Sequence, residues 1–332
     1  MKRSDVLKLG LGLAAAVAAA GVESAQDKVI MRLSHPLPTA HHTAKSIAAF
    51  AADVKAMTSG GVEVQIFPAE QAAKAAENHP AVARGGVEAA ASVNFQWGNT
   101  IPEMNLTVIP FLIADVDKLK KWFDSPIAQI LEAKLEQRGV KNLMWLYTTR
   151  QTIFTGSRPI RAPEDFKGLK VRGLNKLADQ GLIALGAAPS AMAAPEVYQA
   201  LQSGVLDAAQ TDVSAAVSRR FYEVQKFGTV SPQFSVWYHV YVNPSWWNGL
   251  SAAHKDAVKK AARKTELEAF DLTEATAAAA VGTLREKGMT IHIQTPEETA
   301  AWKALTQKPV LDEFLRLAPQ DGQKLIDAVS KL

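Results

Sequence analysis

The sequence predicts an α/β protein of two lobes. Its 332 residues exceed what a single hydrophobic core usually holds. The hydrophobic period switches between two and 3.6 in a strand, helix, strand order, which is typical of a mainly parallel sheet. Residues 251–281 contain neither Gly nor Pro, and a helix over 251–287 would be about 55 Å long at 1.5 Å per residue. Because one lobe is too small for such a helix, we expect it to lie along both.

The composition fits an ordered protein and excludes several classes of function. Hydrophobic residues make up 48% of the chain and charged residues 21%, far from disordered or collagen-like sequences. The chain has 0 Cys, which excludes a disulfide framework, thiolate catalysis, zinc–thiolate sites and iron–sulfur clusters. The formal net charge of +4 is small and scattered, and no basic run is interleaved with aromatic residues, so we expect no nucleic-acid partner.

Residues 1–25 have the pattern of a secretory signal peptide. Three basic residues precede an apolar core over 9–21, and Ser24-Ala25 forms a small-residue exit. A membrane anchor is the alternative, but it needs about 20 apolar residues and this core is shorter. We therefore expect cleavage close to Gln26 and a periplasmic mature protein.

The first lobe is expected to begin with a strand and an Ala-rich helix that stops at Ser59-Gly60-Gly61. Ser125 followed by Pro126 supplies a cap and a first-turn proline for a later helix. The expected strands are 29–34, 62–67, 87–93 and 141–147, and the expected helices are 41–57, a short one ending at Gly85-Gly86, and 126–137.

The second lobe is expected where the pattern changes. Gly156, Pro159 and Pro163 follow in quick succession, which places a first crossing between lobes near residues 147–151. A capping box at Thr295-Pro296-Glu297-Glu298 opens a last helix. The expected strands are 169–172, 188–191, 205–209 and an aromatic-rich crossing strand 236–243, and the helices are 175–185 and 195–202. These crossings divide the chain into lobe I, residues 26–148 and 238–270, and lobe II, residues 149–237 and 271–332.

Two strand ends are expected to face a cleft between the lobes. Asn94, Phe95 and Gln96 follow the buried strand 87–93, and ligands of open α/β sheets bind at the carboxyl ends of strands. Arg172 closes another strand, and a guanidinium there suits a carboxylate because its planar fork donates two parallel hydrogen bonds. The alternative is an ordinary surface arginine at a strand end.

His35, His41 and His42 form the only local histidine cluster in the sequence, and a metal site is one interpretation of it. Against a metal, His41 and His42 are expected to point in different directions at a helix start. No Cys or acidic residue lies near them in the sequence. We therefore expect no metal.

Motifs of catalysis and of cofactor binding are missing from the sequence. It contains no nucleophile elbow, no phosphate-binding P-loop, no zinc-protease helix motif and no calcium loop. We expect a protein that is not an enzyme and that carries no cofactor.

Several motifs occur in a fixed order over most of the mature chain. The two longest are APEDFKGLKVR over residues 162–172 and PEVYQALQSGVLD over 195–207. Shorter ones lie at 35–38, 60–68, 109–112, 185–187 and 223–226. With these motifs the chain resembles the extracytoplasmic solute-binding subunits of tripartite ATP-independent periplasmic (TRAP) transporters, the DctP-type family.

The resemblance implies a periplasmic binding protein fold with a ligand cleft between two lobes, a small organic acid as ligand, and delivery to the membrane permease subunits of a TRAP transporter. It assigns the ligand carboxylate to Arg172. Arg150 stands where many relatives carry a second pocket arginine or a polar group, and His35 begins one of the shared motifs, so both are included as candidate ligand-binding residues.

The chain departs from the family pattern at three places. Gln210 replaces a commonly acidic residue, which argues against a cation bound with the ligand, and Gln210 and the following Thr211 remain candidate ligand contacts. Ala194 replaces a Phe that often packs on the ligand. Trp237 and Tyr238 are expected to refill the vacated volume as an aromatic wall, with packing in the core as the alternative.

The expected ligand is a monocarboxylate, with hydroxy, oxo and aromatic acids all open. Two other functions are compatible with the sequence. The same scaffold serves as a ligand-sensing subunit for a receptor kinase, and a secreted enzyme is a weaker alternative because no base and nucleophile are found together.

Overall fold

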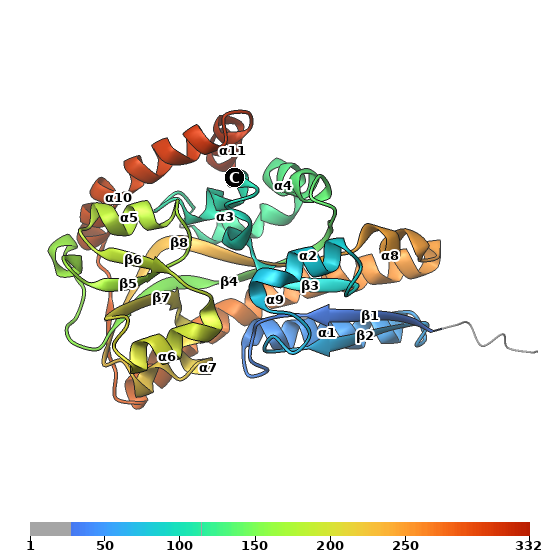
Figure 1. Ribbon diagram of the computed structural model, residues 1–332, viewed down its shortest axis with the longest axis horizontal. Coiled ribbons are helices and arrows are strands. Elements are labelled where there is room, and N and C mark those ends of the chain that lie inside the picture. Colours follow the sequence, from blue (N-terminus) through green and yellow to red (C-terminus); the bar gives the residue numbers. More distant parts are fainter. Residues whose placement is uncertain (1–27, 114) are drawn as a thin grey trace, which may run out of the picture.

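The computed structural model describes residues 28–113 and 115–332, apart from the side chains of residues 149–152. The expected signal peptide, residues 1–25, lies outside the described residues. The fold is an α/β structure built on one continuous nine-stranded sheet in the order β2-β1-β3-β8-β4-β7-β5-β6, with β9 paired to β8 (Figure 1). The strands are β1 (Val29–Ser34), β2 (Val62–Phe67), β3 (Ala89–Val93), β4 (Lys141–Thr155), β5 (Lys170–Gly173), β6 (Ala188–Ala191), β7 (Ala208–Asp212), β8 (Phe227–Val242) and β9 (Thr290–Ile293).

Two long antiparallel strands, β4 and β8, join the two halves of the sheet. The C-terminal end of β8, Tyr238–Val242, pairs with β3 of the first lobe, whereas the C-terminal end of β4, Gln151–Thr155, pairs with β7 of the second. Register shifts fall on either side of Arg150, where the partners change. The sequence predicted only parts of these strands, because polar and small residues interrupt the hydrophobic alternation at the crossing while the backbone ladder continues.

Helices cover both halves of the sheet (Figure 1). They are α1 (His42–Met57), α2 (Asn78–Ala83), α3 (Val116–Lys120), α4 (Pro126–Glu136), α5 (Asp179–Ala184), α6 (Val197–Gln202), α7 (Val213–Ser218), α8 (Pro244–Gly249), α9 (Ala252–Glu286), α10 (Pro296–Leu317) and α11 (Gly322–Ser330). Within the ranges described, no helix combines the length and the apolar character needed to cross a bilayer.

The long helix α9 confirms the expectation from the Gly- and Pro-free stretch. It has 35 residues, and the Ser251 hydroxyl caps its start by accepting a hydrogen bond from the backbone N–H of His254 at 3.1 Å. It packs against α1 in the first lobe and against α7 and β9 in the second, with β4 between them. The helix therefore spans both lobes.

The C-terminal helices divide between the lobes, which differs from the expected placement of residues 271–332 wholly in lobe II. The capping box at Thr295 and Glu298 forms as expected, and α10 packs on α5. However, α11 packs on α4, and Phe314, Leu325 and Val329 belong to the core of the first lobe. An amphipathic helix signals only that it has a buried face, not which surface buries it.

Two element boundaries and one short strand also differ from expectation. β7 begins at Ala208 instead of residue 205, because Val205 is exposed in a turn. The helix expected over 175–185 shrinks to α5, because the side chain of Asn175 accepts hydrogen bonds from the N–H groups of Leu177 and Ala178 and holds a turn there. The short strand β9 was not expected.

Candidate functional site

A cavity of about 360 Å³ is lined by residues from both lobes and from the crossing strand β8. The first lobe contributes Leu37, His41, Phe95, Gln96 and Asn99, the second contributes Arg172, Asn175, Met192, Thr211, Asp212 and Arg219, and β8 contributes Tyr238. The wall thus combines apolar surface with a few polar and charged groups, which is typical of small-molecule sites.

Arg172 is buried at the end of β5 with its guanidinium in the cavity wall. Its side chain is 5% exposed, and it donates hydrogen bonds from Nε to the carbonyl of Met192 at 3.1 Å and from Nη1 to the carbonyl of Gln210 at 2.8 Å. Burial, followed by the positive charge of Arg219, lowers the pKa of Arg172 to about 10. Arg172 therefore stays charged at neutral pH, and Nη2 has no protein hydrogen-bond partner among the described residues.

Asn175 connects the lobes beside Arg172. Its Nδ2 donates to the carbonyl of Phe95 at 2.7 Å and to Oδ1 of Asn105 at 2.7 Å, both in the first lobe. The same side chain caps the turn before α5, so one residue orders its own loop and holds the opposite wall.

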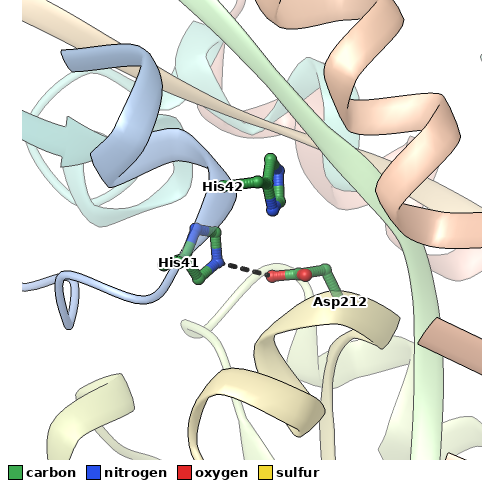
Figure 2. Close-up of side chains that lie close together, drawn as sticks. All are labelled: His41, His42 and Asp212. Atoms are coloured by element: carbon green, nitrogen blue, oxygen red, sulfur yellow. Dashed lines mark ion pairs between the residues drawn. The ribbon is translucent and has the colours of Figure 1, made fainter. Parts of the chain in front are cut away.

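A second contact between the lobes joins the start of α1 to the start of α7. Figure 2 shows His41 and His42 stacked beside Asp212, with ring centroids 4.4 Å apart and planes inclined by 27°. Nε2 of His41 lies 3.7 Å from Oδ2 of Asp212. Ser214 donates to Oδ1 of Asp212 at 2.8 Å, so its oxygen accepts from Nδ1 of His42 at 3.2 Å. From the sequence we expected His41 and His42 to point in different directions and to have no acidic neighbour. Both expectations are wrong, because the two rings stack and Asp212 lies beside them.

Burial and neighbouring charges set the protonation of this group. Burial, together with the charge of His41, lowers the pKa of His42 to about 4. Burial by itself raises the pKa of Asp212, but hydrogen bonding and charge from His41, with His42 and Ser214, outweigh it and hold that pKa well below its usual range. Asp212 is therefore ionised and His42 neutral at physiological pH.

The same three residues bring one ligand atom each within 4.8 Å of one another, which is close enough to consider a metal. Their geometry fits a metal poorly. The lone pairs of stacked imidazoles lie in nearly parallel planes and do not converge. In addition, Nδ1 of His41 accepts from the N–H of Thr43 at 3.1 Å. Binding an ion through Nε2 would place the ring proton on Nδ1 and lose that hydrogen bond. The arrangement suits a charge contact between lobes.

The predicted ligand-binding residues fall into two groups. Arg172, Phe95, Gln96, Thr211 and Tyr238 line the cavity. The other described candidates, Asn94, His35, Gln210 and Trp237, do not. The side chain of Arg150 lies outside the described residues.

Three of the residues outside the cavity have structural contacts instead. Asn94 is buried and donates from Nδ2 to Oγ1 of Thr107 at 2.7 Å. Nδ1 of His35 accepts from the N–H of Leu37 at 3.2 Å within a turn. Gln210 offers its backbone carbonyl to Arg172. His35 and Gln210 thus contact Leu37 and Arg172, which line the cavity, whereas the partner of Asn94 does not line it.

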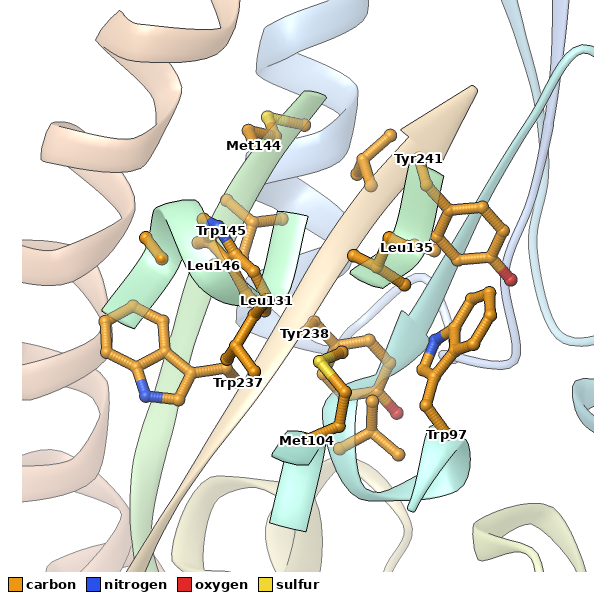
Figure 3. Packing of buried hydrophobic residues seen from close by; sticks show 14 of the residues in the cluster. Trp97, Met104, Leu131, Leu135, Met144, Trp145, Leu146, Trp237, Tyr238 and Tyr241 are labelled. Carbon is orange, nitrogen blue, oxygen red and sulfur yellow. The ribbon is translucent and has the colours of Figure 1, made fainter. Parts of the chain in front are cut away.

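Trp237 corrects the expectation of an aromatic wall made from two neighbouring residues. It is 0% exposed and stacks on Trp122 at a centroid distance of 5.0 Å. In Figure 3, Trp237 and Tyr238 extend to opposite sides of β8. Successive side chains of a strand alternate between faces, so only one of the two can reach the cavity.

Sequence reasoning missed several cavity residues, chiefly Asn175, Asp212 and Arg219. Asp212 directly follows the candidate Thr211, which was a usable signal because both stand at the carboxyl end of one strand. No local pattern marks Arg219, since it reaches the cavity from the far end of the short helix α7.

Two α/β lobes joined by long crossing strands and a spanning helix, with a buried arginine in the cavity that both lobes line, define a solute-binding protein. The chain belongs to the family described as bacterial extracellular solute-binding protein, family 7, also called DctP, whose model matches residues 33–317. This is the family of TRAP solute receptors, so the resemblance inferred from the motifs is confirmed.

Individual relatives agree with this assignment. The C4-dicarboxylate-binding periplasmic protein DctP of Rhodobacter capsulatus is 30% identical over 96% of this chain and 95% of its own length. A TRAP periplasmic solute-binding protein of Sulfurospirillum deleyianum, solved with bound succinate, superposes with a TM-score of 0.85 at 27% identity, covering 91% of this chain and 99% of that one. A Bordetella pertussis extracytoplasmic receptor that binds pyroglutamic acid gives a TM-score of 0.86 at 26% identity, covering 92% and 100%.

Proposed function

We propose that this protein is a periplasmic receptor that captures a small organic acid and hands it to the membrane permease subunits of a TRAP transporter. The observation that carries the proposal is Arg172, a buried and charged guanidinium in the cavity wall. Two of its nitrogens are fixed by backbone carbonyls, so its orientation is set before the ligand arrives. A carboxylate is the group that such a fork recognises best.

The relatives support an acid as the class of ligand. Their ligands are a C4-dicarboxylate, succinate and pyroglutamic acid, each of which carries a carboxylate. The sequence favoured a monocarboxylate for this chain. The cavity raises a dicarboxylate as a second candidate, because a second guanidinium, that of Arg219, also lines it.

On this proposal the protein binds the acid without converting it. It is located in the periplasm after removal of residues 1–25. Incubating the purified protein with a bound acid should return the acid unchanged, which mass spectrometry of the released ligand checks. Amino-terminal sequencing of the periplasmic fraction should find a start close to Gln26, and full-length protein in the membrane fraction contradicts the location.

The test of the function is a thermal-shift screen of the mature protein against mono- and dicarboxylic acids, followed by calorimetry. A ligand that binds only the folded state stabilises it by about 2.7 kcal/mol when its concentration is 100 times its dissociation constant. This stabilisation raises the melting temperature. If no organic acid in the screen binds, the proposed function is wrong.

We predict that Arg172→Gln abolishes binding of every acid found in the screen and that Arg172→Lys recovers only part of it. Removing one partner of a buried charged pair costs about 3–5 kcal/mol, and an ammonium lacks the two-pronged contact. Lys170→Gln is the matched control, because it removes a positive charge from an exposed position of the same strand. Circular dichroism must show that each variant folds. Near-normal affinity of folded Arg172→Gln contradicts the assignment.

A further inference from the structure

Arg219 places a second guanidinium in the cavity wall. It follows the last residue of α7 as the C-terminal cap of that helix, and it lines the cavity together with Arg172. Arg172 enters from β5, whereas Arg219 enters from the end of a six-residue helix that starts after β7, about 9 Å further along its axis. The two cations therefore reach the cavity from different elements.

The side chain of Arg219 has no partner of opposite charge among the described residues. Its Nε is buried without a hydrogen bond. The one carboxylate in the described cavity wall, Asp212, is already occupied. Its Oδ1 accepts from Ser214 at 2.8 Å and from the N–H of Ala215 at 2.7 Å, and its Oδ2 faces His41.

The next residue in the chain, Arg220, is an arginine whose charge is paired within the protein. Arg220 is exposed, forms an ion pair with Glu223, and does not line the cavity. The contrast makes it a matched control for Arg219 in the same turn.

Two like charges line one cavity, and no described residue forms an ion pair with either of them. The charge of Arg219 contributes, after burial, to the lowered pKa of Arg172, and it also opposes the burial that raises the pKa of Tyr238 to about 12. Two neighbouring positive charges that are partly buried repel each other, and an anion between them relieves this cost. One carboxylate on Arg172 leaves Arg219 unsatisfied.

We propose that Arg219 is a specificity-determining residue that binds a second acidic group of the ligand, so that this protein selects dicarboxylic acids over monocarboxylic acids of the same chain length. The inference rests on the proposed function and names the substrate class of the same cavity. It also replaces the monocarboxylate favoured by the sequence.

The experiment measures dissociation constants by calorimetry for matched probes: succinate against butyrate, and glutarate against valerate. It compares the unaltered mature protein with Arg219→Gln, Arg219→Lys and the control Arg220→Gln. We expect the unaltered protein to prefer the diacid in at least one pair. Arg219→Gln should lower the ratio of diacid to monoacid affinity by about 30-fold or more, the effect of removing one partner of a buried charge pair. Arg219→Lys should restore part of the ratio, and Arg220→Gln should leave it unchanged.

The outcomes separate this inference from the proposed function. If acids bind, depend on Arg172, and keep the same ratio in Arg219→Gln, the inference is overturned and the function stands. A preference for the monoacid in the unaltered protein overturns it as well, and so does an equal ratio change in Arg220→Gln. If Arg219→Gln fails to fold, the ratio in folded Arg219→Lys decides, and an unchanged ratio there counts against the inference. Binding of no acid at all overturns both proposals.

Discussion

At the scale of single residues, neighbours on one strand have opposite environments. Trp237 packs among Trp122, Tyr147 and Phe123, whereas Tyr238 lines the cavity and is 7% exposed. The sequence shows two adjacent aromatic residues, and only the pairing of β8 with its neighbours decides which one faces the cavity.

We predict that Trp237→Ala destabilises the protein by about 3–5 kcal/mol, because it empties a packed aromatic cluster, while the folded fraction keeps its ligand affinity.

Tyr238→Phe should have the opposite pair of effects, on ligand binding and not on stability. It retains the ring and therefore the stability within about 1 kcal/mol, but it removes the hydroxyl from the cavity wall and changes the affinity or the order of preferred acids. Urea unfolding and calorimetry measure the two effects. An altered ligand spectrum in Trp237→Ala contradicts the core assignment.

At the scale of elements, α9 is attached to β4 through a buried carboxyl group. Oε1 of Glu266 accepts from the backbone N–H of Trp145 at 2.8 Å, and Oε2 lies 3.3 Å from Nη1 of Arg263. Burial raises the pKa of Glu266 to about 7, and the hydrogen bond from Trp145 and the charge of Arg263 offset this only in part. The carboxyl group is thus easier to protonate in the folded protein than in the unfolded chain.

We predict that this carboxyl group makes the protein less stable as the pH rises. Its pKa is higher in the folded than in the unfolded state, so the folded state binds more protons between pH 4.5 and about 7, and the free energy of unfolding falls across that window. The loss is at most about 3 kcal/mol. Glu266→Gln keeps an oxygen for Trp145 and should flatten the dependence, while Glu268→Gln, an exposed change on the same helix, should not. Unfolding curves at several pH values measure this, and an unchanged slope in Glu266→Gln contradicts it.

At the scale of the whole molecule, the lobes are joined covalently by β4, β8 and α9 and touch again across the cavity. Asn175 holds the carbonyl of Phe95 and the side chain of Asn105, and Asp212 lies beside His41. The covalent connections allow a hinge, and the contacts across the cavity favour its closed position. A ligand that touches both walls adds to the same bias.

We predict that a bound acid reduces the radius of gyration in small-angle scattering and that Asn175→Asp enlarges it in the absence of ligand. Asp keeps the oxygen that caps Leu177 and Ala178 but loses the donor and repels the carbonyl of Phe95. Two lost hydrogen bonds of about 1 kcal/mol each shift an open–closed equilibrium by more than tenfold. Asn248→Asp, at an exposed position, is the control. An unchanged radius at saturating ligand, with binding confirmed separately, contradicts the closure.

The sequence by itself determined the features that depend on residues close together in the chain, namely most helices and strands. Hydrophobic spacing, caps such as Ser251 and Thr295, and the glycine stop after α1 fixed most helices and strands, because these depend on contacts within one or two turns. Long family motifs identified the class of protein, and a charged fork at the end of a strand predicted Arg172 as the residue that binds the ligand carboxylate.

Only the tertiary structure decided which distant residues share the cavity. It brings Ser214 to His42 across 172 residues of chain, turns Trp237 into the core and packs α11 on the first lobe. Among the described residues, it also leaves Nε of Arg219 without a hydrogen-bond partner. The physical reason is that these positions depend on where β4 and β8 cross and on which lobe buries each apolar face. Local periodicity specifies that a face is buried, but the surface that buries it belongs to a segment far away in the chain.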